Sequence, residues 1–220
     1  MSEPVKRRSG GPTRSYDGSG RAAESDRTRR RVLDAARALL VEEGYRSTTV
    51  AAIAERAGVH HDTVYRLVGR KPVVLGRLVE EALSGEDRVV PASERPYVAA
   101  IRSAPDAATK IDLYAAATRG MLERLAPLFT ALRDAAGTEP EARELWSGFS
   151  ARRAANMRAF VADVAGAGGL RDGLDVETAA DTVWLTNSPE TYVMLTDERA
   201  WTPDRYERWL ADTWKRLLLP

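Results

Sequence analysis

The chain has 220 residues, with 33 Lys and Arg against 32 Asp and Glu, a formal net charge of +1, and no cysteine. Its length suits one helical domain with a small appendage, or two small domains. The lack of cysteine excludes disulfides and thiolate metal sites. The N-terminus has no apolar signal segment and no run approaches the ~18 apolar residues of a membrane span, so we expect a cytoplasmic protein without a membrane anchor.

The two signs of charge are distributed unevenly along the chain. Residues 1–72 contain 15 basic and 9 acidic side chains, whereas residues 73–220 contain 18 and 23. A basic front and an acidic back are typical of a protein that binds a polyanion at one end. Chance scatter also produces differences of this size, so the asymmetry is supporting evidence only.

Residues 1–24 are rich in Gly, Ser, Pro and Arg and contain few large apolar side chains. This composition predicts a disordered segment. Its basic side chains suit an arm that follows DNA phosphates or enters a minor groove, and a solvated tail explains them equally well. They are Lys6, Arg7, Arg8, Arg14 and Arg21.

The first predicted helix covers residues 26–43 and ends at Gly44. Val32, Leu33, Ala36 and Leu39 form its apolar stripe. The arginines at positions 27, 29, 30 and 31 fall in its first turns, where the helix dipole disfavours cations. Nearby phosphates would explain this arrangement.

Residues 48–71 predict two short helices joined by a tight turn. The first follows the capping hydroxyls of Thr48 and Thr49 and covers residues 50–57. Gly58 supplies the left-handed turn, and the second helix covers residues 61–68. Its inner face is apolar and its outer face is polar, which matches a helix-turn-helix whose second helix enters the major groove. A solvated helical hairpin is the alternative.

The rest of the chain also predicts helices, with no strand-like alternation and no repeat, so we expect an all-α protein. A helix over residues 72–83 begins with proline and has apolar positions on one face. Pro127 is expected to break the helix that starts near Asp106, and Thr138 to Glu141 has the pattern of a capping box. The expected helices cover residues 94–103, 106–125, 138–164, one after Asp175 that Ser188-Pro189 kinks or restarts, and one after Thr202.

The sequence over about residues 28–83 resembles the N-terminal domain of the tetracycline-repressor (TetR) family of bacterial regulators. The resemblance lies in RRRVLDAARALLVEEGY, in TTVAAIAERAGV, and in TVY followed by Lys71. It implies a DNA-binding domain over residues 25–71 and a ligand-binding and dimerisation domain over residues 72–220, with residues 72–84 as the connecting helix. The DNA-binding residues that it implies are Thr49, Ala51, His61, Asp62, Thr63, Tyr65, Arg66 and Lys71.

In that family the C-terminal half binds a small molecule and forms a homodimer through its last two helices. The sequence supports pairing independently, because the apolar stripe of the final helix is wider than one neighbouring helix would bury. A dimer with two reading heads predicts a palindromic operator. The stripe consists of Tyr206, Trp209, Leu210, Thr213, Trp214, Leu217 and Leu218.

Evidence for a ligand site lies mainly on the helix over residues 138–164. At 100° per residue, Arg152, Arg153 and Asn156 share the side of its apolar stripe. An inward charge needs a partner, which is either an internal carboxylate such as Asp112 or Asp181, or an acidic or carbonyl-bearing ligand. The predicted ligand-binding residues are Thr118, Trp146, Phe149, Arg152, Arg153, Asn156, Trp184 and Asn187.

The residue inventory argues against an enzyme, a cofactor or a metal site. The two histidines, His60 and His61, are adjacent, and their roughly 100° separation on a helix makes a poor chelate. No glycine-rich phosphate loop is present. We therefore expect a DNA-binding transcriptional repressor that an unidentified small-molecule effector releases. The alternative is a dimeric helical ligand-binding or interaction protein that does not act through DNA.

Overall fold

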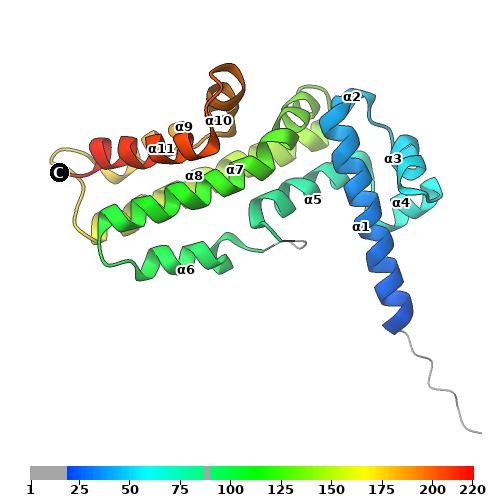
Figure 1. Cartoon of the computed structure of the whole chain (residues 1–220), viewed down its shortest axis with the longest axis horizontal. Coiled ribbons are helices and arrows are strands. Elements are labelled where there is room, and N and C mark those ends of the chain that lie inside the picture. The colour runs from blue at the N-terminus through cyan, green and yellow to red at the C-terminus, as the bar shows by residue number, and fades with distance from the viewer. Residues whose placement is uncertain (1–18, 87–89) are drawn as a thin grey trace, which may run out of the picture.

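The computed structural model describes residues 19–86 and 90–220, and the described residues form helices and their connections without any strand. The all-α prediction is therefore confirmed. Figure 1 shows an elongated molecule with a small head of short helices at one end and a longer helical body at the other. Most of the predicted N-terminal arm, residues 1–18, lies outside the described residues.

Helix α1 (Ser19–Glu42) begins earlier than the sequence predicts, so residues 19–24 are helical instead of belonging to an arm. Alanine, arginine and glutamate over this stretch are good helix formers, and no proline or cap interrupts them. Arg27 to Arg31 therefore lie beyond the first turns, and the predicted conflict with the helix dipole does not arise. The inner face of α1 packs into the head through buried Val32, Ala36 and Leu40.

The head is completed by α2 (Gly44–Ser47), α3 (Val50–Ala57) and α4 (His61–Leu67). Gly44 and Gly58 have positive φ values of 78° and 65°, a conformation that glycine adopts without steric penalty. They end α1 and α3 and set the directions of the following helices. Ile53 and Val64 are fully buried between α1, α3 and α4, so the polar side of α4 faces outward.

Helix α5 (Lys71–Ser84) leads from the head into the body. It packs against α1, α7 and α8. Gly76 permits close packing, since a Cβ there would lie 3.1 Å from a Leu145 methyl carbon. The 3₁₀ turn η1 (Ala92–Glu94) and α6 (Pro96–Ser103) follow.

Helix α7 (Ala107–Thr138) runs the length of the body to the head (Figure 1) and is continuous through Pro127. The predicted break at Pro127 is wrong. Pro127 lies on the exposed side of α7, where the carbonyl of Glu123 that loses its partner is open to solvent. Leu125, Leu128 and Phe129 are buried around it, and their packing maintains the helix.

The predicted capping box at the start of α8 (Pro140–Gly166) is also wrong. Thr138 is the last residue of α7, and its hydroxyl donates to the Asp134 and Ala135 carbonyl oxygens. Glu139 is the N-cap residue, but its side chain does not cap the helix. Its carboxylate instead accepts a hydrogen bond of 2.7 Å from the Tyr45 hydroxyl.

The remaining elements are α9 (Val176–Thr186), α10 (Pro189–Val193), the π-helical turn η2 (Met194–Glu198) and α11 (Pro203–Leu218). Asp175 and Thr202 cap α9 and α11 through their side chains, as the sequence predicts. The helix restarts after Ser188, whose side chain caps α10. Figure 1 shows α9 and α11 along the side of the body opposite α6. Trp214 is fully buried against Tyr114 and Phe160.

Candidate functional site

Helix α4 presents one apolar and one polar face. Val64 and the following Val68 are buried, whereas His61, Asp62, Tyr65 and Arg66 are exposed. Tyr65 leaves 49% of its surface accessible, an unusual position for a large aromatic side chain unless it meets a partner. The face is therefore a surface of hydrogen-bonding and aromatic groups on a helix that fits a DNA major groove.

The sequence predicts that the side chains of His60 and His61 point about 100° apart on one helix, and the start of α4 differs from this. His60 is the N-cap residue, not a helical one, and its Nδ1 accepts weakly from the Asp62 N–H at 3.4 Å. The two imidazole centroids are 4.3 Å apart. His60, His61 and Asp62 consequently bring three ligand atoms within 4.8 Å of one another, and all three residues are exposed.

Two more of the predicted DNA-binding residues flank α4. Ala51 is exposed at the start of α3. The Thr49 hydroxyl accepts a 3.0 Å hydrogen bond from the Ala52 N–H and so caps α3. Thr63 is partly buried within α4. A capping Thr49 keeps its O–H available as a donor, so capping and a phosphate contact are compatible.

Lys71 has a structural environment that its sequence position does not reveal. Its Nζ donates to the Tyr45 and Thr48 carbonyl oxygens at 2.9 and 3.0 Å. It also lies 3.9 Å from the centre of the Tyr45 ring. Burial lowers its pKa, and the more distant Glu139 opposes that shift. In this structure the ammonium of Lys71 joins α5 to the end of α2.

The same junction links the head to the body. Tyr45 is buried and donates to Glu139 between α7 and α8, and burial followed by this hydrogen bond raises its pKa. Arg70 forms a 2.7 Å ion pair with Glu141. Hydrogen bonds and an ion pair therefore connect the head to the starts of α5 and α8.

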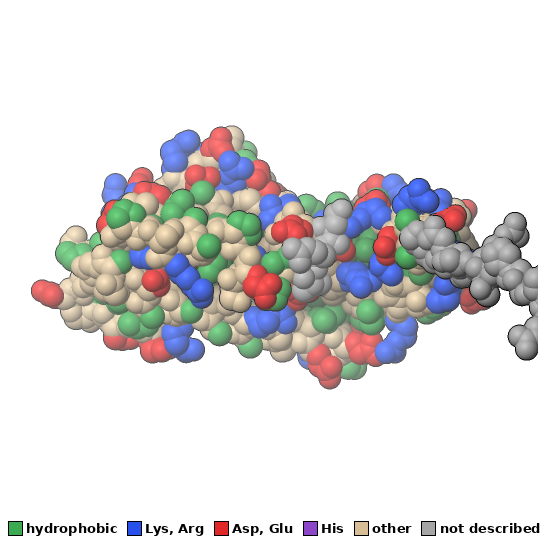
Figure 2. Space-filling view, turned by 90° about the horizontal axis from the view of Figure 1, so that it is seen from below, with side chains coloured by type: hydrophobic (Ala, Val, Ile, Leu, Met, Phe, Trp, Pro, Cys, Tyr) green, Lys and Arg blue, Asp and Glu red, His purple; other side chains and the backbone are tan. Residues whose placement is uncertain are grey.

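The surface shows no large apolar band on the side drawn in Figure 2. Lys and Arg side chains are interspersed with Asp and Glu side chains there, and hydrophobic side chains form scattered spots. Within residues 19–86 and 90–220, no helix combines the length and apolar character that crossing a bilayer requires.

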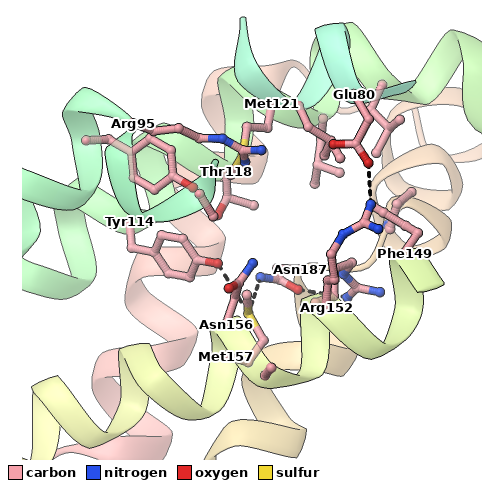
Figure 3. A pocket seen from close by; sticks show the side chains of 18 of the residues that line it. Glu80, Arg95, Tyr114, Thr118, Met121, Phe149, Arg152, Asn156, Met157 and Asn187 are labelled. Carbon is pink, nitrogen blue, oxygen red and sulfur yellow. Dashed lines mark hydrogen bonds and ion pairs between the residues drawn. The ribbon is translucent and has the colours of Figure 1, made fainter. Parts of the chain in front are cut away.

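A cavity of about 600 Å³ lies inside the body, bounded by α5, α6, α7, α8 and the start of α10. This volume is in the range of small-molecule sites. Figure 3 shows Arg95, Thr118 and Tyr114 on one side of it, and Glu80, Arg152 and Phe149 on the other. Asn156, Met157 and Asn187 border the space between them. Leu83, Leu122 and Leu125 add apolar surface to the wall.

Three arginines and one glutamate line this cavity, an excess of two positive charges. Arg152 forms an ion pair with Glu80. Arg153 donates through one Nη to the Trp184 carbonyl and to Asn187 Oδ1. Burial lowers the pKa of Arg153, and the charge of Glu190 partly offsets this effect. Arg95 is only 8% exposed.

The cavity wall also carries neutral polar groups. Tyr114 Oη and Asn187 Nδ2 both contact the Met157 sulfur, at 3.3 and 2.9 Å. Burial raises the pKa of Tyr114, so its hydroxyl stays protonated. Thr118 is 2% exposed, and its hydroxyl has no hydrogen-bond partner among the described residues.

The structure brings most of the predicted ligand-binding residues together. Thr118, Phe149, Arg152, Arg153, Asn156 and Asn187 line the cavity. Trp146 and Trp184 are not among the residues that line it. Trp146 packs against Phe129 and Phe149, whereas Trp184 lies 4.9 Å from the Arg153 guanidinium. Both therefore pack behind residues of the cavity wall, Phe149 and Arg153.

Sequence reasoning missed Arg95 and Glu80 as cavity residues. Arg95 precedes α6 in a proline-punctuated stretch, where periodicity gives no inward face. Glu80 stands on the predicted connecting helix, outside the apolar face that the sequence defines there. The predicted internal partners of the arginines are also wrong, because Asp112 pairs with Lys215 and Asp181 is exposed.

The sequence of the head is similar to that of known proteins. Residues 32–67 match the family described as bacterial regulatory proteins, tetR family. The chain is also 37% identical over 67 residues to the uncharacterized HTH-type transcriptional regulator YvkB of Bacillus subtilis. That alignment covers 30% of this chain and 35% of YvkB, so it describes the head and not the cavity.

Solved structures resemble the chain over most of its length. NalD, the secondary repressor of the MexAB-OprM multidrug efflux pump of Pseudomonas aeruginosa, is 22% identical, with a TM-score of 0.67 over 90% of this chain and 98% of that one. The regulator FadR of Bacillus subtilis, in complex with stearoyl-CoA, is 20% identical, with a TM-score of 0.67 over 84% and 96%. At this identity the likeness establishes the fold alone.

Proposed function

We propose that the protein is a sequence-specific DNA-binding transcriptional repressor and not an enzyme, because residues 32–67 match the model of the tetR family of bacterial regulatory proteins. It acts on chromosomal DNA in the cytoplasm. The observation that carries the proposal is the exposed polar face of α4, whose opposite face is buried in the head. The full-length likeness to the repressor NalD supports the same function.

In this proposal α4 enters the major groove. Arg66 binds a guanine edge or a phosphate, and the exposed Tyr65 contacts the backbone. His61, Asp62 and Thr63 lie toward the groove as well, and Thr49 and Ala51 approach the adjacent backbone. Asp62 accepts a hydrogen bond from a cytosine amino group. Lys71 contributes mainly by fixing the start of α5, given its two carbonyl partners.

The protein acts as a homodimer through α9 and α11. Tyr206, Leu210 and Trp214 of α11 are buried within the chain, but Leu217 of the same stripe is 38% exposed and Leu185 of α9 is 63% exposed. These two helices lie side by side on one side of the body (Figure 1). Their exposed apolar side chains suit packing against a second copy of the chain. Two heads then read a palindromic operator.

Ligand binding in the body releases the operator. Helix α5 carries Glu80 and Leu83 in the cavity wall and Lys71 in the head, so a shift of α5 changes the spacing of the two reading helices. By linkage, the ligand must bind more tightly to the conformation that does not bind DNA. The ligand complex of the similar FadR structure supports a small-molecule effector.

A salt-dependent gel shift with the DNA upstream of the protein's own gene tests the DNA-binding function. We expect specific binding that weakens steeply with salt, because each neutralised phosphate releases counterions. Tyr65→Ala should weaken binding to all sequences alike. Failure to bind that DNA, or any DNA selected from a random pool, would leave the alternative of a ligand-binding protein that does not act through DNA.

A sedimentation experiment tests the dimer separately. Leu185→Glu places a charge on an exposed position and so should leave the fold of the subunit intact. We expect the native chain to sediment as a dimer and the variant as a monomer with much weaker operator binding. An unchanged dimer in the variant would contradict the proposed interface.

A further inference from the structure

The guanidinium of Arg95 is buried at the wall of the cavity. Its Nε donates to the Val90 carbonyl at 3.2 Å, and one Nη lies 3.9 Å from the Met121 sulfur, a weak acceptor. No carboxylate among residues 19–86 and 90–220 lies within ion-pair distance of it. An arginine has five N–H donors. Most of the N–H groups of Arg95 therefore remain available to a molecule bound in the cavity.

A second unsatisfied group lies beside it. Thr118 stands one helical turn before Met121 on the same face of α7, and Figure 3 shows both next to Arg95 at the cavity. The Thr118 hydroxyl is buried, and no group in residues 19–86 or 90–220 forms a hydrogen bond with it. Leaving a buried donor unsatisfied is unfavourable. A cation without a carboxylate partner and a hydroxyl without an acceptor, both at the same cavity and among the described residues, form a site for an anionic oxygen.

The other two arginines of the cavity are better compensated. Arg152 is neutralised by Glu80. Arg153 lies 5.9 and 4.9 Å from the Phe149 and Trp184 rings and donates to two oxygens. Among the three, Arg95 has the weakest acceptors, a carbonyl oxygen at 3.2 Å and a sulfur at 3.9 Å, and the excess positive charge of the lining favours an anion there.

The other residues of the cavity wall determine which kind of ligand fits beside the anionic group. Leu83, Met121, Leu122, Leu125 and Phe149 supply apolar surface on several sides. A strongly polar molecule would leave that surface unpaired, whereas an apolar chain or ring would bury it, at about 25 cal/mol per Å². The chemistry is thus that of an amphipathic molecule with one anionic end.

We propose that the cavity binds an organic carboxylate with an apolar body, whose carboxylate is held by Arg95 and Thr118. A planar carboxylate matches the paired donors of a guanidinium. The regulatory meaning of this site rests on the proposed function, since the carboxylate would then be the effector that weakens operator binding. The selectivity for an anion does not rest on it and is measured without DNA.

Calorimetry on the full chain tests this site with matched pairs of probes: decanoate against 1-decanol, and 4-phenylbutanoate against 4-phenylbutan-1-ol. At least one carboxylate should bind, at least tenfold more tightly than its matched alcohol. Arg95→Gln should lower carboxylate affinity at least tenfold and leave alcohol binding unchanged. Arg158→Gln is the matched control, because Arg158 also lies in the body but pairs with Glu177 on the surface.

Circular dichroism of each variant checks its folding, and Thr118→Val provides a second variant that keeps every charge. It too should weaken carboxylate binding selectively. Binding of neither carboxylate, equal binding of alcohol and carboxylate, or unchanged carboxylate affinity in folded Arg95→Gln or Thr118→Val would overturn the proposal. Operator binding measured on the same ligand-free preparation reports on the proposed function independently, so the two failures are distinguishable.

Discussion

The head and the body of this protein place their polar groups in opposite ways. In the head, the interior is apolar and the polar side chains of α4 point outward. In the body, three arginines and Thr118 line a cavity between the helices. The outward groups suit a large polyanion that approaches from outside. The inward groups suit a small anion that the body encloses, at a site whose wall includes the helix that reaches the head.

Lys71 gives the largest expected effect on the fold of the head. Lys71→Met removes the ammonium that binds the Tyr45 and Thr48 carbonyl oxygens. Hydrogen bonds from charged groups contribute about 1.5–3 kcal/mol, and partial exposure places the expected loss of unfolding free energy near the lower value. Urea denaturation measures it. A variant with native stability and weakened DNA binding would instead support the phosphate contact that the sequence implies.

Arg66 tests the outward-facing half of the comparison. Arg66→Ala should weaken operator binding by about 1–3 kcal/mol, since one charged contact to a base or phosphate is lost. Fluorescence anisotropy with labelled duplex measures this change. The unfolding free energy should stay within about 0.5 kcal/mol of the native value, because the side chain is exposed. If the Arg66→Ala variant bound every duplex with native affinity, Arg66 would not contact DNA.

Thr118 tests the inward-facing half. Thr118→Val replaces a buried, unpartnered hydroxyl with a methyl group of similar size, so unfolding free energy should be unchanged or higher by up to about 1 kcal/mol. Decanoate affinity should fall about tenfold at the same time. Thermal unfolding and calorimetry measure the two quantities. A clear loss of stability would show that the hydroxyl serves the fold.

Replacement of Asp175 is expected to have the smallest effect on the unfolding free energy, and this effect depends on pH. Hydrogen bonds from the Thr178 backbone N–H and hydroxyl lower the pKa of Asp175. The unfolded state therefore binds a proton more readily, so the stabilisation is complete above the unfolded value of about 3.9 and disappears as pH falls through the folded value.

Asp175→Ala should therefore destabilise the chain at neutral pH and have less effect in acid. Urea denaturation at both pH values measures the difference. Asp172→Ala is the control, because Asp172 is exposed and caps no helix. A destabilisation by Asp175→Ala that is equal at the two pH values would show that the lost cap does not act through the carboxylate charge.

The head could be predicted almost completely from the sequence, because its signals are local. Thr49, Gly58 and the apolar spacing of α3 define a helix and a turn without reference to distant residues. The role of Lys71 could not be predicted, since its partners are backbone carbonyls of a preceding turn. Local signals also misled: Pro127 does not break α7, because buried neighbours hold the helix together.

The cavity could be predicted only in part. Helical periodicity on α8 correctly grouped Phe149, Arg152, Arg153 and Asn156. Arg95 and Glu80 come from other helices or connections, and only the packing of α5, α6 and α7 brings them to the same space. The identity of the neutralised arginine likewise depends on which carboxylate is close, and that is a property of the tertiary structure.

Selection of bound sequences from a pool of random duplexes tests the central claim most directly. The protein should enrich an inverted repeat whose half-sites lie one DNA turn or a multiple of it apart, and Arg66→Ala should change or abolish that enrichment. Recovery of unrelated sequences, or of a single half-site without symmetry, would contradict the account of two outward-facing α4 helices held at a fixed spacing.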